Sequence, residues 1–517
     1  MTDAALDLLV LGSGVAGLSA AVRAAAAEPG LRVGVLTKGR LEQATTRWAQ
    51  GGVAAVLGGD PDSTDLHLAD TLKAGAGLCD PDAVRVLVDE GPARVNELIA
   101  WGAVFDREKG GGLALAREGG HTVARVVHAG GAATGAEIER ALVAAVKDTA
   151  AAVMEDWFAL DLVTASGRCT GVVALDPSGI PHQVRARHVL LATGGAGQLY
   201  AVTTNPPEAT GDGMAMALRA KAPVADMEFM QFHPTALHHP SMPRPLLSEA
   251  LRGHGALLRD TNGERFVDEL RSRDVVSRAM AARMAEQGVE HLWLDATGLE
   301  DFDRRFPTIS ATMRAAGLDP SSEWLPVAPA AHYTIGGVLT DLDGATGLPG
   351  LWAAGEAACS GVHGANRLGS NSLLEGMVFA ARVVEAILAG KSEGEATGAM
   401  RGTWLSPPEE PADDGYVPLP PKGDVAKLRE TLQRALTVHA GVSRDVDSLA
   451  EARRQLHAIV PAWPPGAGRD SLELRNLVTV ASALLGSAAA REESRGAHAR
   501  ADFPATSPAF AHRIVHR

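Results

Sequence analysis

Cysteine is scarce in this chain, and long apolar runs are absent from it. The 517 residues include three cysteines, Cys79, Cys169 and Cys359, and none of them forms a C-x-x-C pair. This spacing argues against a disulfide framework, a zinc site and an iron–sulfur site, and it fits a reducing cytoplasm. No apolar stretch reaches the roughly 18 residues of a membrane span. Residues 1–7 are acidic and lead straight into a buried-strand pattern, so we expect no signal peptide.

Runs of basic residues are also missing. The net charge of −14 argues against a nucleic acid partner. Hydrophobic residues make up 46% of the chain and charged residues 21%, which is typical of a globular protein with a large core. At this length we expect two to four domains. A small acidic substrate is compatible with the charge, because a local group of cations can override the global field.

Glycine is abundant, and the first glycine-rich turn follows a strand pattern. The apolar run Leu6–Leu11 leads into Gly12-Ser13-Gly14-Val15-Ala16-Gly17, which opens a helix to about Ala27. Such a G-x-G-x-x-G turn lets the backbone approach a pyrophosphate closely. The next strand, residues 32–36, is followed by Lys38 instead of a ribose-binding acid, so Lys38 suits a phosphate or a ring oxygen. A glycine turn without a nucleotide remains the alternative for this stretch alone.

Two further strand-to-glycine turns lie at residues 193–197 and 355–361. Three such turns, together with the polar loop at residues 43–52, indicate a large extended cofactor rather than a mononucleotide. Asp212, at the start of a predicted helix, is either a helix cap or an acceptor for a cofactor hydroxyl. Glu356 would bind a ribose, or else it is a carboxylate at a helix terminus.

The order of strand and helix patterns predicts an α/β fold with an insertion. A nucleotide-binding domain is interrupted by an α+β domain and is followed by a linker and a helical bundle. The predicted boundaries are 1–222 and 335–405 for the nucleotide-binding domain, 223–334 for the insertion and 406–517 for the C-terminal part.

Prolines are expected to break one predicted helix, to end one predicted strand and to form one linker. The helical spacing over residues 81–102 should break near Gly91-Pro92, because proline removes a helix hydrogen bond. Residues 228–235 alternate like a strand, and we expect this strand to end at Pro234. The proline-rich residues 391–422 are expected to form a linker or a wrapped loop.

Four cationic or proton-accepting side chains are predicted to surround the cofactor. His233, Arg273 and His332 come from the insertion, and Arg367 follows the third glycine turn. Together they would form a cationic pocket for a substrate with two carboxylates. A lone histidine is more often a structural hydrogen-bonding residue, and no carboxylate pattern supports a metal site here. No G-x-S-x-G nucleophile elbow occurs.

Several motifs together carry a family resemblance. They are residues 12–17, Trp48-Ala49-Gln50-Gly51-Gly52, Gln231-Phe232-His233-Pro234-Thr235, Arg273-Asp274, His332-Tyr333-Thr334 and the stretch from Gly355 to Glu375. The chain thereby resembles, over nearly its whole length, the flavoprotein family of succinate dehydrogenase, fumarate reductase and L-aspartate oxidase. The resemblance implies FAD, a Rossmann-like FAD-binding domain interrupted by an α+β capping domain, a C-terminal helical bundle, and oxidation or reduction of a dicarboxylate.

Two positions point to one branch of that family. Thr45 stands where the dehydrogenase subunits carry a histidine linked to the flavin, so the resemblance implies noncovalent FAD. Glu118 stands in Arg117-Glu118-Gly119-Gly120-His121, where aspartate oxidases carry glutamate and the dehydrogenases glutamine. A carboxylate there would pair with the ammonium group of aspartate, which succinate lacks.

The resemblance therefore implies oxidation of L-aspartate to iminoaspartate, with hydride transfer from C2 to flavin N5. The flavin would be reoxidised by O2, giving H2O2, or by fumarate. The reaction would open de novo NAD biosynthesis, with quinolinate synthase as functional partner and no membrane involved. The first alternative is a soluble fumarate reductase or succinate dehydrogenase flavoprotein subunit. The second is an electron-transfer or scaffold flavoprotein that binds a partner through its C-terminal helices.

The same resemblance assigns roles to residues. Arg273 would exchange a proton, and Glu249 is the candidate relay because an arginine, with a pKa of about 12.5 or more, is a poor base. Ser248 stands where aspartate oxidases often carry threonine, and it keeps the hydroxyl. The substrate would be held by Glu118, Gln231, His233, Ser248, His332, Arg367 and Ser370. FAD would contact Gly12, Ser13, Gly14, Val15, Ala16, Gly17, Lys38, Thr45, Thr46, Arg47, Trp48, Ala49, Gln50, Gly51, Gly52, Asp212, Glu356, Asn371, Ser372 and Leu373.

Overall fold

The computed structural model describes residues 5–402, 404–407, 424–459 and 468–517. Its largest layer is a seven-stranded sheet built from β1 (Leu6–Leu11), β2 (Val33–Leu36), β6 (Ala152–Met154), β7 (Phe158–Ala165), β8 (Arg168–Leu175), β9 (Pro181–Leu191) and β16 (Leu351–Ala353). The strand order is β6-β2-β1-β9-β8-β7, with β16 also paired to β9. Strands β6, β2, β1, β9 and β16 are parallel, whereas β7, β8 and β9 form an antiparallel meander.

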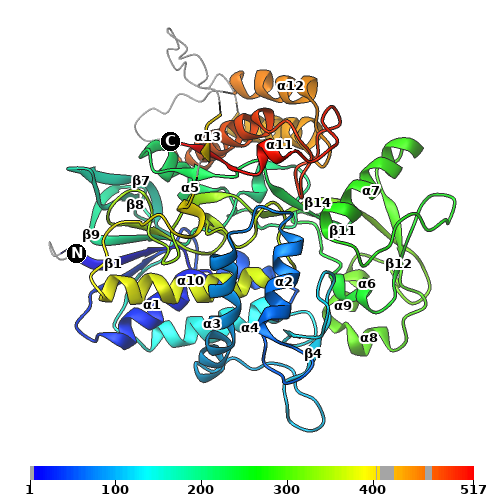
Figure 1. Cartoon of the computed structure of the whole chain (residues 1–517), viewed down its shortest axis with the longest axis horizontal. Helices are drawn as coiled ribbons and strands as arrows, with labels where there is room; N and C mark the ends of the chain where they lie inside the picture. The colour runs from blue at the N-terminus through cyan, green and yellow to red at the C-terminus, as the bar shows by residue number, and fades with distance from the viewer. Residues whose placement is uncertain (1–4, 403, 408–423, 460–467) are drawn as a thin grey trace.

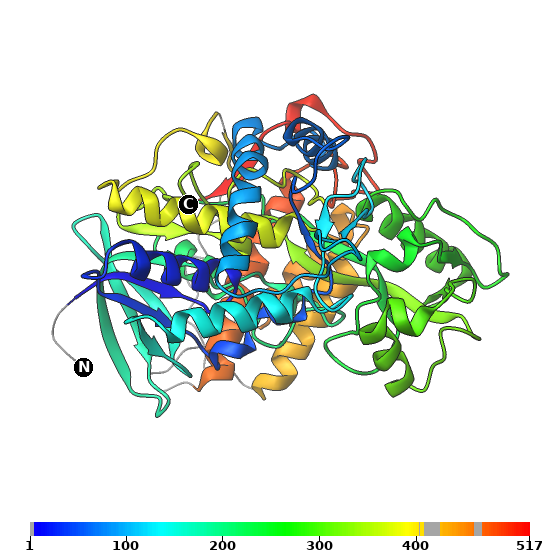
Figure 2. The same ribbon diagram turned by 90° about the horizontal axis from the view of Figure 1, so that it is seen from below.

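Both faces of this sheet are covered by helices. Leu8 and Val10 of β1 share a buried cluster with one group of helices, and Leu9 and Leu11 share another with a second group. This alternation is what a strand buried on both faces requires. Figures 1 and 2 show α1 and α10 side by side on one face. The first group is α1 (Val15–Ala27), α3 (Pro81–Ala100), α4 (Thr134–Lys147) and α10 (Asn371–Leu388), and the second includes α5 (Asp212–Arg219) and the C-terminal helices.

The predicted break in the helix at residues 81–102 is wrong. Helix α3 runs unbroken from Pro81 to Ala100, with Pro92 inside it. A Cβ on Gly91 would lie 2.9 Å from Leu374 Cδ2, so the missing side chain lets α3 pack closely against α10. Burial against α10 offsets the cost of an internal proline, about 3 kcal/mol.

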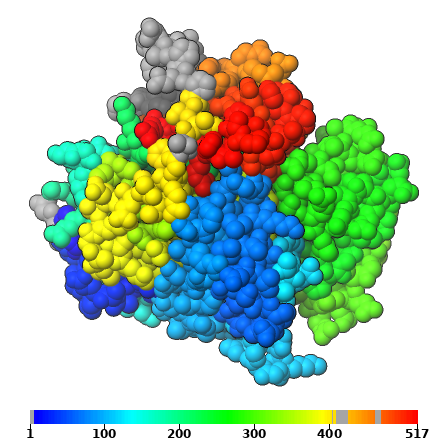
Figure 3. Space-filling model, viewed as in Figure 1, coloured from blue at the N-terminus to red at the C-terminus, as the bar shows by residue number. Residues whose placement is uncertain are grey.

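The inserted region forms a lobe of its own, drawn in green in Figures 1 and 3. Its antiparallel sheet has the order β11-β14-β13-β12. Strand β11 does not end at Pro234 as predicted but continues to Leu237. Proline is tolerated because β11 is an edge strand and its register shifts between His233 and Ala236. The elements are β11 (Met230–Leu237), α6 (Glu249–Gly253), β12 (Leu257–Arg259), α7 (Arg273–Gln287), β13 (Leu292–Asp295), α8 (Phe302–Arg305), α9 (Pro307–Ala315) and β14 (Leu325–Thr334).

In the described part of the C-terminal region, three helices pack on the far side of the large sheet. They are α11 (Val425–His439), α12 (Val446–His457) and α13 (Arg469–Ala490), of which α12 lacked a clear sequence signal. The charged segment after α13 folds back on the core, where the Arg491 guanidinium lies 2.5 Å from Glu228. The chain end then enters a five-stranded sheet as β19, between β10 and β18, in the order β17-β15-β10-β19-β18. These strands are β10 (Val224–Ala225), β15 (Gly337–Leu339), β17 (Ala358–Cys359), β18 (Trp404–Leu405) and β19 (Arg513–His516).

One further helix and one small sheet belong to the described residues. They are α2 (Thr64–Ala74) and the small sheet of β3 (Val53–Ala54), β4 (Leu115–Ala116) and β5 (Val126–Val127). Most of the predicted proline-rich linker, residues 408–422, lies outside the described residues. Among the described residues, no helix combines the length and the apolarity that crossing a membrane requires.

Candidate active site

The three glycine turns meet at one large cavity. Its lining includes residues 12–16, 43–46, 48–52, 192–194 and 354–356, and its space, mouth included, is about 1740 Å³. The turns meet because parallel strands β1, β9 and β16 all end at this edge of the sheet. Gly12 has a φ of 109°, and a Cβ there would lie 2.2 Å from the Ala192 carbonyl oxygen. The first two turns therefore touch, and only glycine fits between them.

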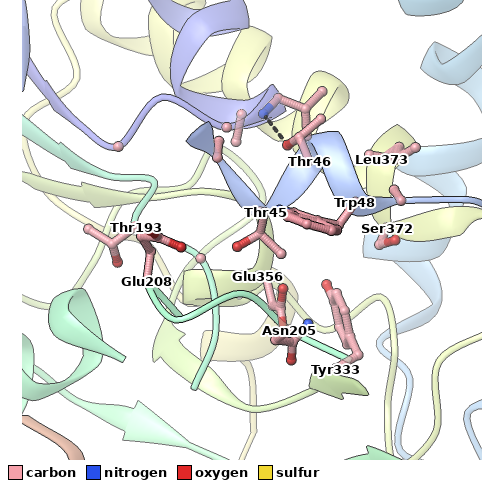
Figure 4. A pocket seen from close by; sticks show the side chains of 18 of the residues that line it. Thr45, Thr46, Trp48, Thr193, Asn205, Glu208, Tyr333, Glu356, Ser372 and Leu373 are labelled. Atoms are coloured by element: carbon pink, nitrogen blue, oxygen red, sulfur yellow. Dashed lines mark hydrogen bonds between the residues drawn. The ribbon is translucent and has the colours of Figure 1, made fainter. Parts of the chain in front are cut away.

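The polar loop at residues 43–52 forms one wall of the cavity. It contains a short 3₁₀ helix, Thr45–Trp48, which places Thr45, Thr46 and Trp48 toward the cavity in Figure 4. The Thr46 hydroxyl accepts a hydrogen bond from the Val15 amide at 2.9 Å, the dashed line in Figure 4. This bond ties the loop to the start of α1, whose positive dipole end faces the cavity through Gly14 and Val15.

Unpaired polar atoms in the lining show what kind of molecule the cavity fits. Gln50 Oε1 and Asn205 Oδ1 are buried acceptors without a hydrogen-bond partner among the described residues. Buried acceptors are normally satisfied, so both call for a donor on a bound molecule. Trp48 lines the same cavity with 53% of its surface exposed. A cofactor with a dinucleotide pyrophosphate, hydroxyl groups and a flat N–H-bearing ring fits these residues.

Three of the predicted cofactor residues lie away from the lining. Gly17 packs inside the turn, where a Cβ would lie 2.1 Å from the Gly12 carbonyl oxygen. The Arg47 guanidinium is on the outside and donates to the Glu42 carbonyl oxygen at 3.4 Å. Asn371 is fully buried, with its side-chain amide bonded to His67 and Thr71. These three act on the cavity through the backbone they support, and the other seventeen line it directly.

Lys38 and Asp212 reach the cavity as a pair. The Lys38 ammonium donates to Asp212 at 2.8 Å, to Thr210 at 2.6 Å and to Glu473 of α13 at 3.1 Å. The ammonium thus has protein partners of its own, which the sequence did not indicate because Glu473 lies 435 residues away. Burial opposes the charge of Asp212, yet Lys38 keeps the pKa of this carboxyl below its usual range.

Glu356 lies in the same wall as Asn205 and Tyr333, as Figure 4 shows. Its Oε1 accepts the Thr334 amide at 2.9 Å. Burial raises the pKa of Glu356 to about 7. Sequence reasoning missed Thr204, Asn205 and Glu208 in this wall, although they follow the second glycine turn closely.

At the capping end of the cavity two arginines share one amide. Gln231 Oε1 accepts from Arg367 Nη2 at 3.0 Å and from Arg273 Nη1 at 3.3 Å. Arg273 Nε also donates to Glu249 at 2.8 Å. Gln231 does not itself line the cavity, so it positions the two arginines, both of which do. Two guanidinium groups held this way form a site for carboxylates.

Two histidines lie at the same end of the cavity as these arginines. The rings of His233 and His332 lie 5.1 Å apart, edge to face. Burial, and then the charge of Arg273, hold the pKa of both imidazoles well below the usual range, so both are neutral. Because His233 Nδ1 accepts the Thr235 amide, its proton sits on Nε2 and is available for donation. Ser248 lines the cavity beside them and caps α6.

Glu118 is a second buried carboxylate close to Arg273, which is itself paired with Glu249. It lines the cavity, accepts from Ser370 at 2.6 Å and from His128 Nε2 at 3.0 Å, and is almost wholly buried. Burial opposes its charge, yet hydrogen bonds from His128 and Ser370 and the charges of His128 and Arg273 lower its pKa to about 2. His128 was not identified from the sequence. Among the described residues, no group of His, Cys, Asp and Glu has the arrangement of a metal site.

Comparisons with known proteins agree with this geometry. Residues 7–373 match the family model described as an FAD binding domain, and residues 429–513 match that described as a fumarate reductase flavoprotein C-terminal domain. The L-aspartate oxidase of Streptomyces coelicolor is 50% identical, with 96% of this chain and 89% of that protein covered. The chain belongs to the L-aspartate oxidase family. A family member from Mycobacterium tuberculosis is 44% identical, with 99% of this chain and 95% of that protein covered.

The family stands within the succinate dehydrogenase and fumarate reductase flavoproteins. A solved E. coli quinol fumarate reductase chain matches with a TM-score of 0.84 at 30% identity, covering 99% of this chain and 94% of that one. The predicted resemblance and α/β fold class are thereby confirmed. This family member is an FAD-dependent amino acid oxidase, and the unpaired acceptors and glycine turns of its cavity are consistent with FAD.

Proposed function

We propose that the enzyme oxidises L-aspartate to iminoaspartate. The observation that carries this proposal is Glu118, a buried carboxylate that lines the cavity beside two arginines. A carboxylate there repels a substrate that carries only carboxylates, and it attracts one that also carries an ammonium group. Relatives with the printed name L-aspartate oxidase at 44–50% identity support the same substrate.

The two ends of the substrate meet different groups of residues. Arg367, His332 and His233 donate to the two carboxylates, and the Ser248 hydroxyl adds a further hydrogen bond. Glu118, which accepts a hydrogen bond from Ser370, receives the ammonium group. This opposition fixes which face of C2 is presented to the cofactor wall.

The oxidation removes a hydride from C2 and one proton from the ammonium group, which leaves a protonated imine. FAD, bound noncovalently in the cavity lined by Thr45, would supply the hydride acceptor at N5, and O2, giving H2O2, or fumarate would reoxidise it. Arg273 exchanges the proton, and Glu249, whose Oε2 accepts from Arg273 Nε at 2.8 Å, relays it. On the family resemblance we place the reaction at the start of de novo NAD biosynthesis, coupled to quinolinate synthase. Iminoaspartate hydrolyses readily, which favours its prompt use by the next enzyme.

The second candidate is succinate oxidation or fumarate reduction as the main activity. It is favoured by the likeness to the E. coli quinol fumarate reductase chain. The cationic end would serve either substrate equally well. Glu118 favours aspartate over succinate, because succinate offers no partner for a buried anion.

Anaerobic titration of the purified holoenzyme separates the two candidates. We expect L-aspartate to bleach the flavin absorbance stoichiometrically and succinate to leave it nearly unchanged. The same sample, exposed to O2 afterwards, should recover its absorbance and release H2O2. Bleaching by succinate alone would refute oxidation of aspartate as the function.

Glu118→Gln should remove the preference for aspartate. The glutamine keeps the shape but not the charge, so the KM for aspartate is expected to rise at least about 30-fold, while fumarate is still reduced. Steady-state assays with each substrate measure this. Glu451→Gln on the outer face of α12 is the matched control and should leave both KM values unchanged. Unaltered aspartate kinetics in Glu118→Gln would remove this residue from substrate binding.

A further inference from the structure

His128 stands directly behind the carboxylate that meets the ammonium group. It follows β5, and its Nε2 lies 3.0 Å from Glu118 Oε1. Glu118 lines the cavity and His128 does not, so His128 can reach a substrate only through Glu118. On the other side, Ser370 donates to Glu118 Oε2 at 2.6 Å. The carboxylate is thus held by one donor from each of two separate segments.

Burial and the neighbouring Glu249 carboxylate oppose a negative charge on Glu118, whereas Arg273 favours it. A Cβ built on Gly369 would lie 3.4 Å from Glu118 Oε2, 3.6 Å from Glu249 Oε2 and 3.2 Å from Arg273 Nη2. The buried carboxylates of Glu118 and Glu249 therefore lie close to each other beside Gly369. Arg273, the arginine next to both, is already paired with Glu249. Arg252 of α6 lies behind Glu249 at 3.7 Å, and His121 of the same loop as Glu118 is bonded to the Gly369 carbonyl oxygen.

Loss of the His128 donor would leave Glu118 with one hydrogen bond in a buried site. A carboxylate in that position takes up a proton more readily, because burial and a nearby like charge both disfavour the ionised form. A neutral carboxylic acid no longer repels the carboxylates of succinate or fumarate. It also pairs poorly with an ammonium group.

We infer that His128 sets the preference for an amino dicarboxylate over an amine-free one, by holding Glu118 ionised and aimed into the cavity. His128 is therefore a positioning residue, and this inference rests on the proposed function. The discrimination belongs to a pair of residues, of which only Glu118 touches the substrate.

The test uses the FAD-loaded holoenzyme and three substitutions at one position. His128→Phe removes the hydrogen-bond donor, and His128→Asn places its N–H too far from Glu118. His128→Gln keeps an N–H within reach of Glu118. The readout is the KM for aspartate divided by the inhibition constant of succinate. We expect this quotient to rise about tenfold or more in the phenylalanine and asparagine variants and to stay within about threefold of wild type in the glutamine variant. His182→Phe, which breaks the 2.9 Å His182–Asp176 pair on the outer hairpin, is the matched control.

The pH dependence of aspartate affinity is a second measurement, and a general loss of packing would not shift it. Glu118 has to be ionised for aspartate to bind, so affinity is lost as pH falls through its pKa. That pKa is about 2 with His128 present. Without the donor the acid limb of the aspartate affinity should shift to higher pH, and the glutamine variant should restore it.

Two results would overturn the inference. One is an unchanged quotient of aspartate KM to succinate inhibition constant in His128→Asn with FAD still bound. The other is a rise of this quotient in His128→Gln as large as that in His128→Asn. Failure of the wild-type enzyme to oxidise aspartate would instead refute the proposed function, so the two failures are distinguishable.

Discussion

Arg367→Met is expected to raise the KM for aspartate by roughly 100- to 3000-fold. The Arg367 guanidinium is buried, donates to Gln231 and Ser372, and lies 4.3 Å above the Tyr333 ring. Burial, and then repulsion from Arg273, lower its pKa to about 10, so it is still a cation at neutral pH. Methionine leaves a desolvated substrate carboxylate without its partner, which costs about 3–5 kcal/mol. Steady-state kinetics over a wide range of aspartate concentrations measure the change.

Arg367→Lys and Arg401→Met are the controls for this result. Lysine keeps the charge but loses the flat fork of donors, so its KM should fall between wild type and methionine. Arg401 pairs with Asp82 on the surface, and its replacement should leave the KM unchanged. Flavin content has to be equal in all samples. An aspartate KM within about twofold of wild type in Arg367→Met would show that this arginine does not bind the substrate.

Arg273→Leu is expected to slow the reductive half-reaction by about 100- to 10,000-fold. The Arg273 side chain lines the cavity and is joined to Glu249 at 2.8 Å, so leucine removes both the exchanging group and its link to the relay. Stopped-flow bleaching of the flavin at saturating aspartate, under anaerobic conditions, gives the limiting rate. The concentration dependence of the same traces gives the affinity.

Two further variants separate the effect of the Arg273 charge on aspartate affinity from the role of Arg273 in proton exchange. Arg273→Lys restores a cation, so it should recover affinity for aspartate but only part of the rate. Glu249→Gln keeps Arg273 in place and breaks the relay, so it should lower the limiting rate with a smaller change in affinity. If Arg273→Leu bleached at the wild-type rate, the proton would leave by another route.

Local patterns predicted the elements that hold the cofactor. The strand Leu6–Leu11 and the helix ending at Ala27 have these bounds in the structure. A turn after a buried strand is a local event, determined by glycine backbone freedom and by apolar periodicity. The same reasoning failed for α3, where packing against Leu374 outweighs the local effect of Pro92.

Local sequence patterns could not predict contacts between segments that lie far apart in the chain. Strand β19 pairs with β10, and Lys38 meets Glu473, because the chain end returns to the core. Asn371 looked like a cofactor residue from its place in a motif, yet it is bonded to His67 and Thr71. A motif determines which residues are near a site, and packing decides which of their side chains face it.

The sequence by itself determined the family, the FAD-binding turns and the residue types of a dicarboxylate site. Each of these depends on residues close together in the chain, and their spacing is readable without coordinates. Only the tertiary structure decided that Gln231 joins Arg273 to Arg367, and that His128 and Ser370 hold Glu118. Ser370 is 252 residues from Glu118. Contacts at that separation arise when the capping sheet and the start of α10 close around one cavity, and hydrogen-bond geometry and burial then determine the charge of each group.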